Sequence, residues 1–184
     1  AQHRVTEVAW VHFDKGQETQ RFSQLLAIGE PLSPEVVKLT GITDAMLDGQ
    51  PKFEEIADKL LDAIAHVDYV VAYNAPFDRL FLETELLRLG KELPARPWVD
   101  PFVFIKELDR FQKGKKLSDA VLRWGVELQD AHRALADATA AGRLLYRLAH
   151  HLAPATLALL LKQQAVWHEQ QELDYRAYKA RQAP

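Results

Sequence analysis

The chain has 184 residues, enough for one domain with an apolar core and a small appendage. Its 48% hydrophobic content argues against disorder. The absence of cysteine excludes disulfides and thiolate metal sites, so any metal would be held by carboxylate, imidazole or water, which favours hard ions such as Mg²⁺ or Mn²⁺. The net charge of −3 argues against a broad phosphate-binding surface but permits a narrow site for a strand end. With no long apolar run or signal-peptide pattern, we expect a cytoplasmic protein without a membrane partner.

The chain begins with patterns typical of a hairpin and then of short helices. Residues 5–13 are rich in branched and aromatic side chains, residues 14–17 favour a turn, and residues 18–28 return as a second strand. After these strands, capping residues, glycines and apolar periodicity predict helices over residues 34–41, 43–46 and 53–66.

The stretch from Val70 to Asp78 has the pattern of a buried strand that turns directly into a helix. Its apolar run ends at Asn74, whose side chain favours an N-cap, and Pro76 fits the first helical turn. Asp78 is therefore expected in or near the first turn of a helix that continues to Leu89, at the carboxyl end of a strand. Open α/β sheets place their ligands at that end, so Asp78 is the first candidate for chemistry.

The second half of the chain is mostly helical. A short strand is predicted over residues 98–100, and residues 113–116 form a basic loop that either contacts backbone phosphate or is a solvated turn. Helices are predicted over residues 102–111, 118–125, 133–151 and 155–180. An opening hairpin followed by helices that alternate with strands predicts an α/β fold whose sheet has an antiparallel portion.

His132 and Asp137 form the second candidate group. Five positions apart, they would lie about 140° apart on one continuous helix. The two side chains can meet if His132 lies in the loop just before the helix that carries Asp137. A carboxylate suits a hard cation, and an imidazole that titrates near neutrality suits the removal of a proton from water.

These motifs resemble those of the DEDDh 3′–5′ exonucleases, the DnaQ-like superfamily of the proofreading subunit of bacterial DNA polymerase III. Residues 74–78 are similar to the second motif of that family, and His132 with Asp137 is similar to the third. Residues 39–43 resemble the segment that borders the bound 3′ end. The resemblance covers about residues 3–150. It implies a ribonuclease H-like mixed sheet with an antiparallel hairpin and flanking helices.

The resemblance also implies an activity, which is metal-dependent hydrolysis of phosphodiester bonds at single-stranded or frayed 3′ ends of DNA or RNA. Two ions, Mg²⁺ or Mn²⁺, would be held partly by the catalytic residues Asp78 and Asp137, with His132 as general base. The residues that it places beside the substrate are Asn74, Phe77, Ile42 and Thr43. Plain alternatives are a place in the core for Phe77 and Ile42, and surface or capping roles for the acids and the histidine. Proofreading, DNA repair and RNA turnover are not distinguished.

One part of the family pattern is absent, because no Asp-x-Glu motif on an opening strand occurs in these 184 residues. The chain starts with residues similar to the approach to the family's second strand, and loss of a central strand would leave ladder groups unmatched. We therefore expect the natural polypeptide to extend before Ala1, the alternative being a degenerate relative. The sequence taken literally, with two of four metal carboxylates, is expected to be inactive.

The expected organisation is an exonuclease-like domain over residues 1–152 and a C-terminal helical extension over residues 153–184. The extension either packs on its own domain or docks a polymerase or a second copy of the chain. Against the exonuclease stands a function of a different class, a catalytically silent module that binds nucleic acid or docks a protein. A third alternative is an unrelated α/β protein with chance matches.

Overall fold

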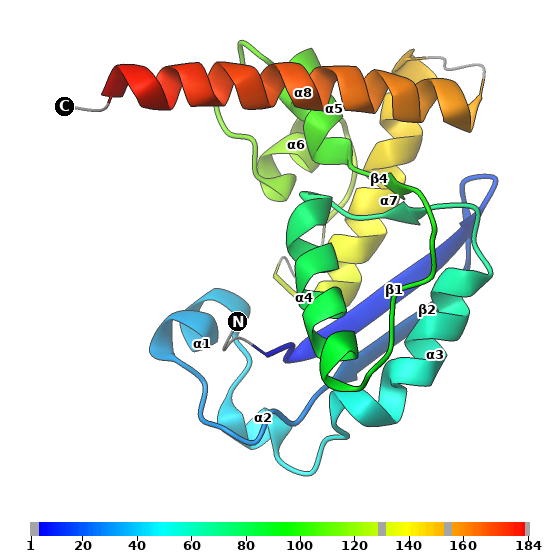
Figure 1. Cartoon of the computed structure of the whole chain (residues 1–184), viewed down its shortest axis with the longest axis vertical. Coiled ribbons are helices and arrows are strands. Elements are labelled where there is room, and N and C mark those ends of the chain that lie inside the picture. Colours follow the sequence, from blue (N-terminus) through cyan, green and yellow to red (C-terminus); the bar gives the residue numbers. More distant parts are fainter. Residues whose placement is uncertain (1–3, 129–131, 153–155, 183–184) are drawn as a thin grey trace.

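The computed structural model describes residues 4–128, 132–152 and 156–182. It opens with the predicted hairpin, β1 (Glu7–Asp14) paired antiparallel with β2 (Gln17–Leu25) (Figure 1). The register places Glu7 opposite Leu25 and shifts between His12 and Phe13. Lys15 and Gly16 close the turn with positive φ angles of 48° and 84°, a conformation that glycine adopts at little cost.

Three helices follow the hairpin, α1 (Pro34–Thr40), α2 (Asp44–Leu47) and α3 (Phe53–Ala65). Their positions agree with the predicted ranges. α3 presents one apolar face to the hairpin, and Phe53, Ile56 and Leu60 form a buried cluster there with Val8 and Leu26. Burial of this face holds the hairpin and α3 together, because apolar surface gains about 25 cal/mol for each Å² removed from water.

The strands further along the chain form a second, separate sheet. β3 (Val70–Val71) pairs in parallel with β4 (Trp98–Val99), and α4 (Ala75–Arg88) follows β3. The predicted α/β fold with an antiparallel hairpin and flanking helices is confirmed, and the described residues pair as one antiparallel and one parallel sheet of two strands each. The central strand that the resemblance implies is not among the strands of the described residues.

The remaining helices are α5 (Pro101–Leu108), α6 (Leu117–Arg123), α7 (Ala134–Leu152) and α8 (Leu157–Gln182). α7 crosses the hairpin and packs mainly on β1 (Figure 1). The close approach requires Gly142, because a Cβ there would lie 2.4 Å from the ring of Phe13. The predicted helix break at Pro154 lies outside the described residues.

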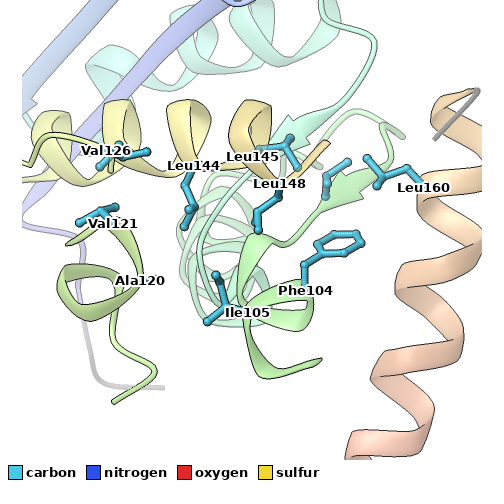
Figure 2. Close-up of a cluster of buried hydrophobic side chains, with 11 residues drawn as sticks. Phe104, Ile105, Ala120, Val121, Val126, Leu144, Leu145, Leu148 and Leu160 are labelled. Atoms are coloured by element: carbon cyan, nitrogen blue, oxygen red, sulfur yellow. The ribbon is translucent and has the colours of Figure 1, made fainter. Parts of the chain in front are cut away.

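The larger apolar core joins α5, α6, α7 and α8, as Figure 2 shows. Leu144, Leu145 and Leu148 of α7 meet Phe104 of α5 and the buried Leu160 of α8. The C-terminal extension therefore packs on its own domain, one of the two predicted alternatives. Among the described residues no single helix is long and apolar enough to cross a membrane; α7 and α8 meet that test only as a pair, by length and composition, with a 95° bend between them.

Candidate active site

The turn between β3 and α4 is held by a carboxylate from another element. Asn74 has left-handed φ and ψ angles of 68° and 50° and makes no side-chain capping bond, so the predicted N-cap bond of Asn74 was wrong. Instead, the carboxylate of Asp100 accepts the backbone N–H of Asn74 at 2.9 Å, of Ala75 at 3.0 Å and of Phe102 at 2.9 Å. Asp100 is buried where α4 and α5 begin, and it satisfies N–H groups that both helices leave free.

Asp78 lies in the first turn of α4, as predicted. Its carboxylate keeps contact with solvent, yet the surrounding protein desolvates it enough to raise its pKa to about 6. The negative charges of Asp100 and Asp137 raise this pKa further, while a backbone hydrogen bond lowers it. Because charges in a protein act over short distances, the effect of Asp137 indicates that the carboxylates of Asp78 and Asp137 lie close enough to interact electrostatically.

His132 lies just before α7, in the loop position that the spacing required. It is exposed, has a φ of 73°, and donates its backbone N–H to Oδ1 of Asp137 at 3.3 Å. Burial raises the pKa of Asp137, and Glu7 raises it too, whereas the hydrogen bond and charge of His132 lower it. The acid therefore fixes the backbone of the histidine.

Glu7 is a site residue that the sequence reasoning missed. Its carboxylate, only 6% exposed, accepts hydrogen bonds from Arg133 at 3.0 and 3.2 Å and from the backbone N–H of Ala134 at 3.1 Å. A carboxylate at a helix N-terminus is favoured by the helix dipole. Glu7 thus ties the loop of His132 to β1, and a lone acid at the start of a strand gives no pattern that could have predicted this.

The candidate substrate-binding residues fall into two places. Phe77 is 58% exposed on α4, beside the turn at Asn74 that joins β3 to α4 (the Asn74 turn). Its ring centroid lies 4.7 Å from that of Phe81. This exposure favours a stacking surface over a place in the core. Ile42 and Thr43 lie between α1 and α2, where Ile42 is 1% exposed and Thr43 is on the surface.

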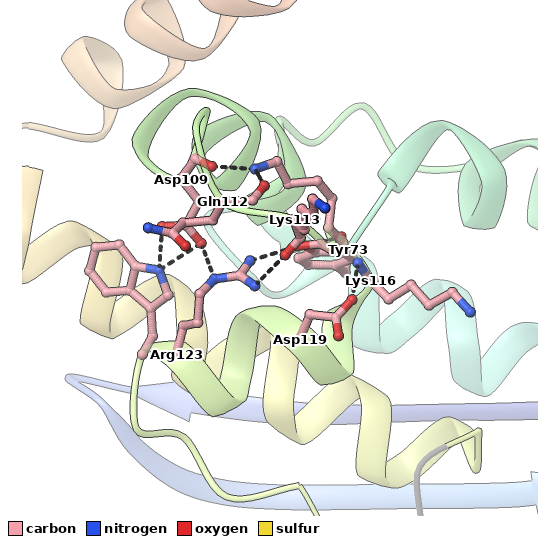
Figure 3. A network of polar contacts seen from close by, with 10 residues as sticks. Tyr73, Asp109, Gln112, Lys113, Lys116, Asp119 and Arg123 are labelled. Atoms are coloured by element: carbon pink, nitrogen blue, oxygen red, sulfur yellow. Dashed lines mark hydrogen bonds and ion pairs between the residues drawn. The ribbon is translucent and has the colours of Figure 1, made fainter.

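The basic loop at residues 113–116 is tied to its own domain (Figure 3). The ammonium group of Lys115 donates to the carbonyl oxygens of Gln112, at 2.7 Å, and of Asp109. Arg123 donates to the carbonyl oxygen of Gly114 at 2.8 Å and pairs with Asp109 at 2.7 Å. Tyr73 donates its hydroxyl to the carbonyl of Lys115 at 2.6 Å. These bonds favour a structural turn over a phosphate contact.

Asp78 and Asp137 are chemically suited to a divalent cation but make only part of a site. Mg²⁺ keeps several waters and often takes one or two carboxylates. Asp100 and Glu7 are already engaged by backbone N–H groups and by Arg133. In the part of the chain that the structure describes, no three His, Asp or Glu side chains are grouped to hold a metal ion.

Residues 1–145 match the exonuclease family RNase_T. The chain belongs to this family. Its membership confirms the predicted DnaQ-like exonuclease superfamily, and nuclease chemistry is the activity of that family. The family region contains the three candidate catalytic residues, and α8 lies beyond it.

Relatives of the exonuclease domain support the same assignment. The PolC-type DNA polymerase III of Halalkalibacterium halodurans is 34% identical over 146 residues, which are 79% of this chain and 10% of that protein. The PolC-type enzyme of Pediococcus pentosaceus is 31% identical over 143 residues, again 10% of its length. The chain thus spans about a tenth of the length of these relatives.

Solved structures share the fold of the exonuclease domain. Exonuclease X in complex with 5′ overhanging duplex DNA superposes with a TM-score of 0.69 at 22% identity, covering 87% of this chain and 90% of that one. The nuclease domain of 3′hExo, a DEDDh family member bound to rAMP, gives 0.67 at 19% identity, covering 81% and 82%. The predicted ribonuclease H-like class is thereby confirmed.

Proposed function

We propose that this exonuclease-family chain acts on the 3′ end of DNA or RNA, in the 3′–5′ direction and with divalent metal ions. The observations that support the proposal are the electrostatic interaction of Asp78 with Asp137 and the backbone hydrogen bond from His132 to the second acid. Single-stranded or frayed ends are the proposed substrates. A polymerase is the proposed partner, because the relatives with the same domain are named DNA polymerase III.

The residues have distinct proposed roles. Asp78 and Asp137 would hold Mg²⁺ or Mn²⁺, which would supply positive charge to stabilise the attacking and leaving oxygens at phosphorus. His132, exposed in its loop, accepts a proton from the attacking water on a neutral ring nitrogen. The exposed ring of Phe77 and the Asn74 turn contact the terminal nucleotide.

The second candidate function is a catalytically silent module that retains the fold. The partial donor set favours it, because the described residues offer no group of three metal ligands. On the exonuclease proposal, an Asp-x-Glu strand between β1 and β3 would supply the two further carboxylates and join the two small sheets. The two candidate functions therefore predict different results when that strand is added: hydrolysis if the chain is an exonuclease, and no hydrolysis if it is a silent module.

Hydrolysis of a 5′-labelled oligonucleotide with Mn²⁺ tests the proposal. We compare three proteins: the 184-residue chain, a version preceded by an Asp-x-Glu strand, and a matched version with Asn-x-Gln. The proposal expects a ladder of shortened products only from the Asp-x-Glu version. No hydrolysis by any of the three proteins would favour the binding module. Robust hydrolysis by the 184-residue chain alone would show that two carboxylates are enough for activity.

A further inference from the structure

A pocket of about 350 Å³ lies beside the candidate active site, between α5, α8 and the Asn74 turn. Asn74 lines it on one side, Phe102 and Lys106 of α5 on another, and residues of α8 on a third. The α8 residues lie beyond the region that matches the exonuclease family. The pocket is therefore formed in part by residues outside the family match.

The wall that α8 contributes is held firmly in place. Gln164 donates to the carbonyl of Trp98 at 3.0 Å and accepts the backbone N–H of Asp100 at 2.7 Å. Two turns further along, Gln171 donates to the carbonyl of Val103 at 2.9 Å. Between them, Trp167 packs its ring edge on Phe104. Figure 1 shows α8 lying across α5 at this position.

Three of the side chains that line this pocket are suited to the parts of a nucleotide. Tyr175 offers an aromatic ring that is 53% exposed, a platform on which a base can stack. Lys106 offers a positive charge for phosphate, and its Nζ lies 4.8 Å from the centre of the Phe102 ring. Glu172 offers a carboxylate that can accept from an exocyclic amino group, as acidic side chains do with N4 of cytosine.

From this combination, and resting on the proposed exonuclease function, we propose that the pocket binds one nucleotide of the substrate strand and favours cytosine over uracil or thymine. Its volume lies at the lower end of small-molecule sites, which suits a single nucleotide and excludes a duplex. Asn74 and Pro76 line the pocket at the start of α4, whose first turn carries Asp78, so a bound nucleotide would lie near that acid.

Direct binding of CMP and UMP tests the proposal, because the two ligands share size and charge and differ in the amino group. The titration is done calorimetrically in EDTA on the full chain carrying Asp78→Asn, so that no hydrolysis is needed. We expect CMP to bind about tenfold more tightly than UMP, the value of one good base contact. Glu172→Gln should remove this difference.

Two tyrosines of α8 supply the matched variants. Tyr175→Ala should weaken CMP binding about tenfold or more, while Tyr175→Phe, which keeps the ring, should not. Tyr178→Ala is the control, because Tyr178 is 55% exposed on the same helix and does not line the pocket. Equal CMP affinity of the Tyr175→Ala and Tyr178→Ala chains, or no CMP binding at all, would overturn the proposal. Neither result bears on the Mn²⁺-dependent hydrolysis that tests the function.

Discussion

The carboxylate of Asp137 accepts the backbone N–H of His132 at 3.3 Å, so the acid of this pair also holds the loop of the histidine. On the proposed function the two residues have separable roles, one in binding cations and fixing the loop, the other in taking a proton. The exposed imidazole contributes little packing, so its removal should affect chemistry far more than folding.

His132→Ala should lower the turnover number about 10²- to 10⁴-fold, the usual contribution of a general base. The measurement is Mn²⁺-dependent hydrolysis by the version that carries Asp-x-Glu, with the melting temperature as a check on folding. His150→Ala is the control, because His150 is also exposed and lies at the other end of α7. Near-normal turnover of the His132→Ala protein would show that another group takes the proton.

The raised pKa of Asp78 has a consequence for stability. In the folded chain this carboxyl has a pKa of about 6, against its ordinary value of 3.8. Between these pH values the folded state binds more protons than the unfolded state. The stability that the protonated Asp78 carboxyl contributes is therefore fully present below pH 3.8 and is lost as the pH rises through 6. Above that window the ionised, partly desolvated acid destabilises the metal-free fold.

Asp78→Asn should therefore raise the melting temperature in EDTA at pH 7.5 and have little effect near pH 4. The gain should be no more than about 1 kcal/mol, because solvent screens an exposed carboxylate. Added Mg²⁺ should stabilise the wild type more than the Asp78→Asn chain, since a ligand of the folded state shifts unfolding by mass action. Asp48→Asn, at an exposed acid on the end of α2, should change neither quantity. A lower melting temperature of Asp78→Asn in EDTA would contradict the argument.

Much of the candidate site could be predicted because its signals are local. The Asn-x-Pro turn placed Asp78 at a helix start, and the spacing of His132 and Asp137 required a loop before α7. Asp100 and Glu7 had no such signal. Asp100 acts on Ala75, 25 positions away, and Glu7 acts on Arg133, 126 positions away. Only the folded chain brings these groups together.

The predicted capping bond of Asn74 was wrong for the same reason, because a residue distant in the sequence determines the local structure. An asparagine before Pro76 suggests a capping side chain, but the Asp100 carboxylate already satisfies the free N–H groups and the backbone turns into the left-handed region. Asparagine tolerates that region better than most residues. The residue type was therefore informative about the turn, although the hydrogen bond inferred from it does not form.

Gly142→Ala should destabilise the fold by about 1–2 kcal/mol. A Cβ at this position would lie 2.4 Å from Cε2 and 2.9 Å from Cζ of Phe13. Such overpacking costs about 1–3 kcal/mol, and the better helix propensity of alanine offsets part of it. Chemical denaturation measures the change, and combination with Phe13→Leu is the control, because a smaller side chain should relieve the clash. If the two substitutions are simply additive, the contact between α7 and β1 does not explain the loss.

Asp100→Ala should destabilise the chain by about 3 kcal/mol or more, because three backbone N–H groups would lose their acceptor and each costs about 1–3 kcal/mol when buried unpaired. Asp100→Asn, which keeps one carbonyl oxygen, should cost less. Because Asp100 positions the Asn74 turn, its loss should also slow hydrolysis by the Asp-x-Glu version, measured well below the melting temperature. Glu85→Ala is a matched control, because Glu85 is another buried acid, 2% exposed, that binds Arg4 and Val5 near the other end of α4. It should destabilise the fold and spare the rate. An equal loss of rate in both variants would mean that Asp100 acts through stability alone.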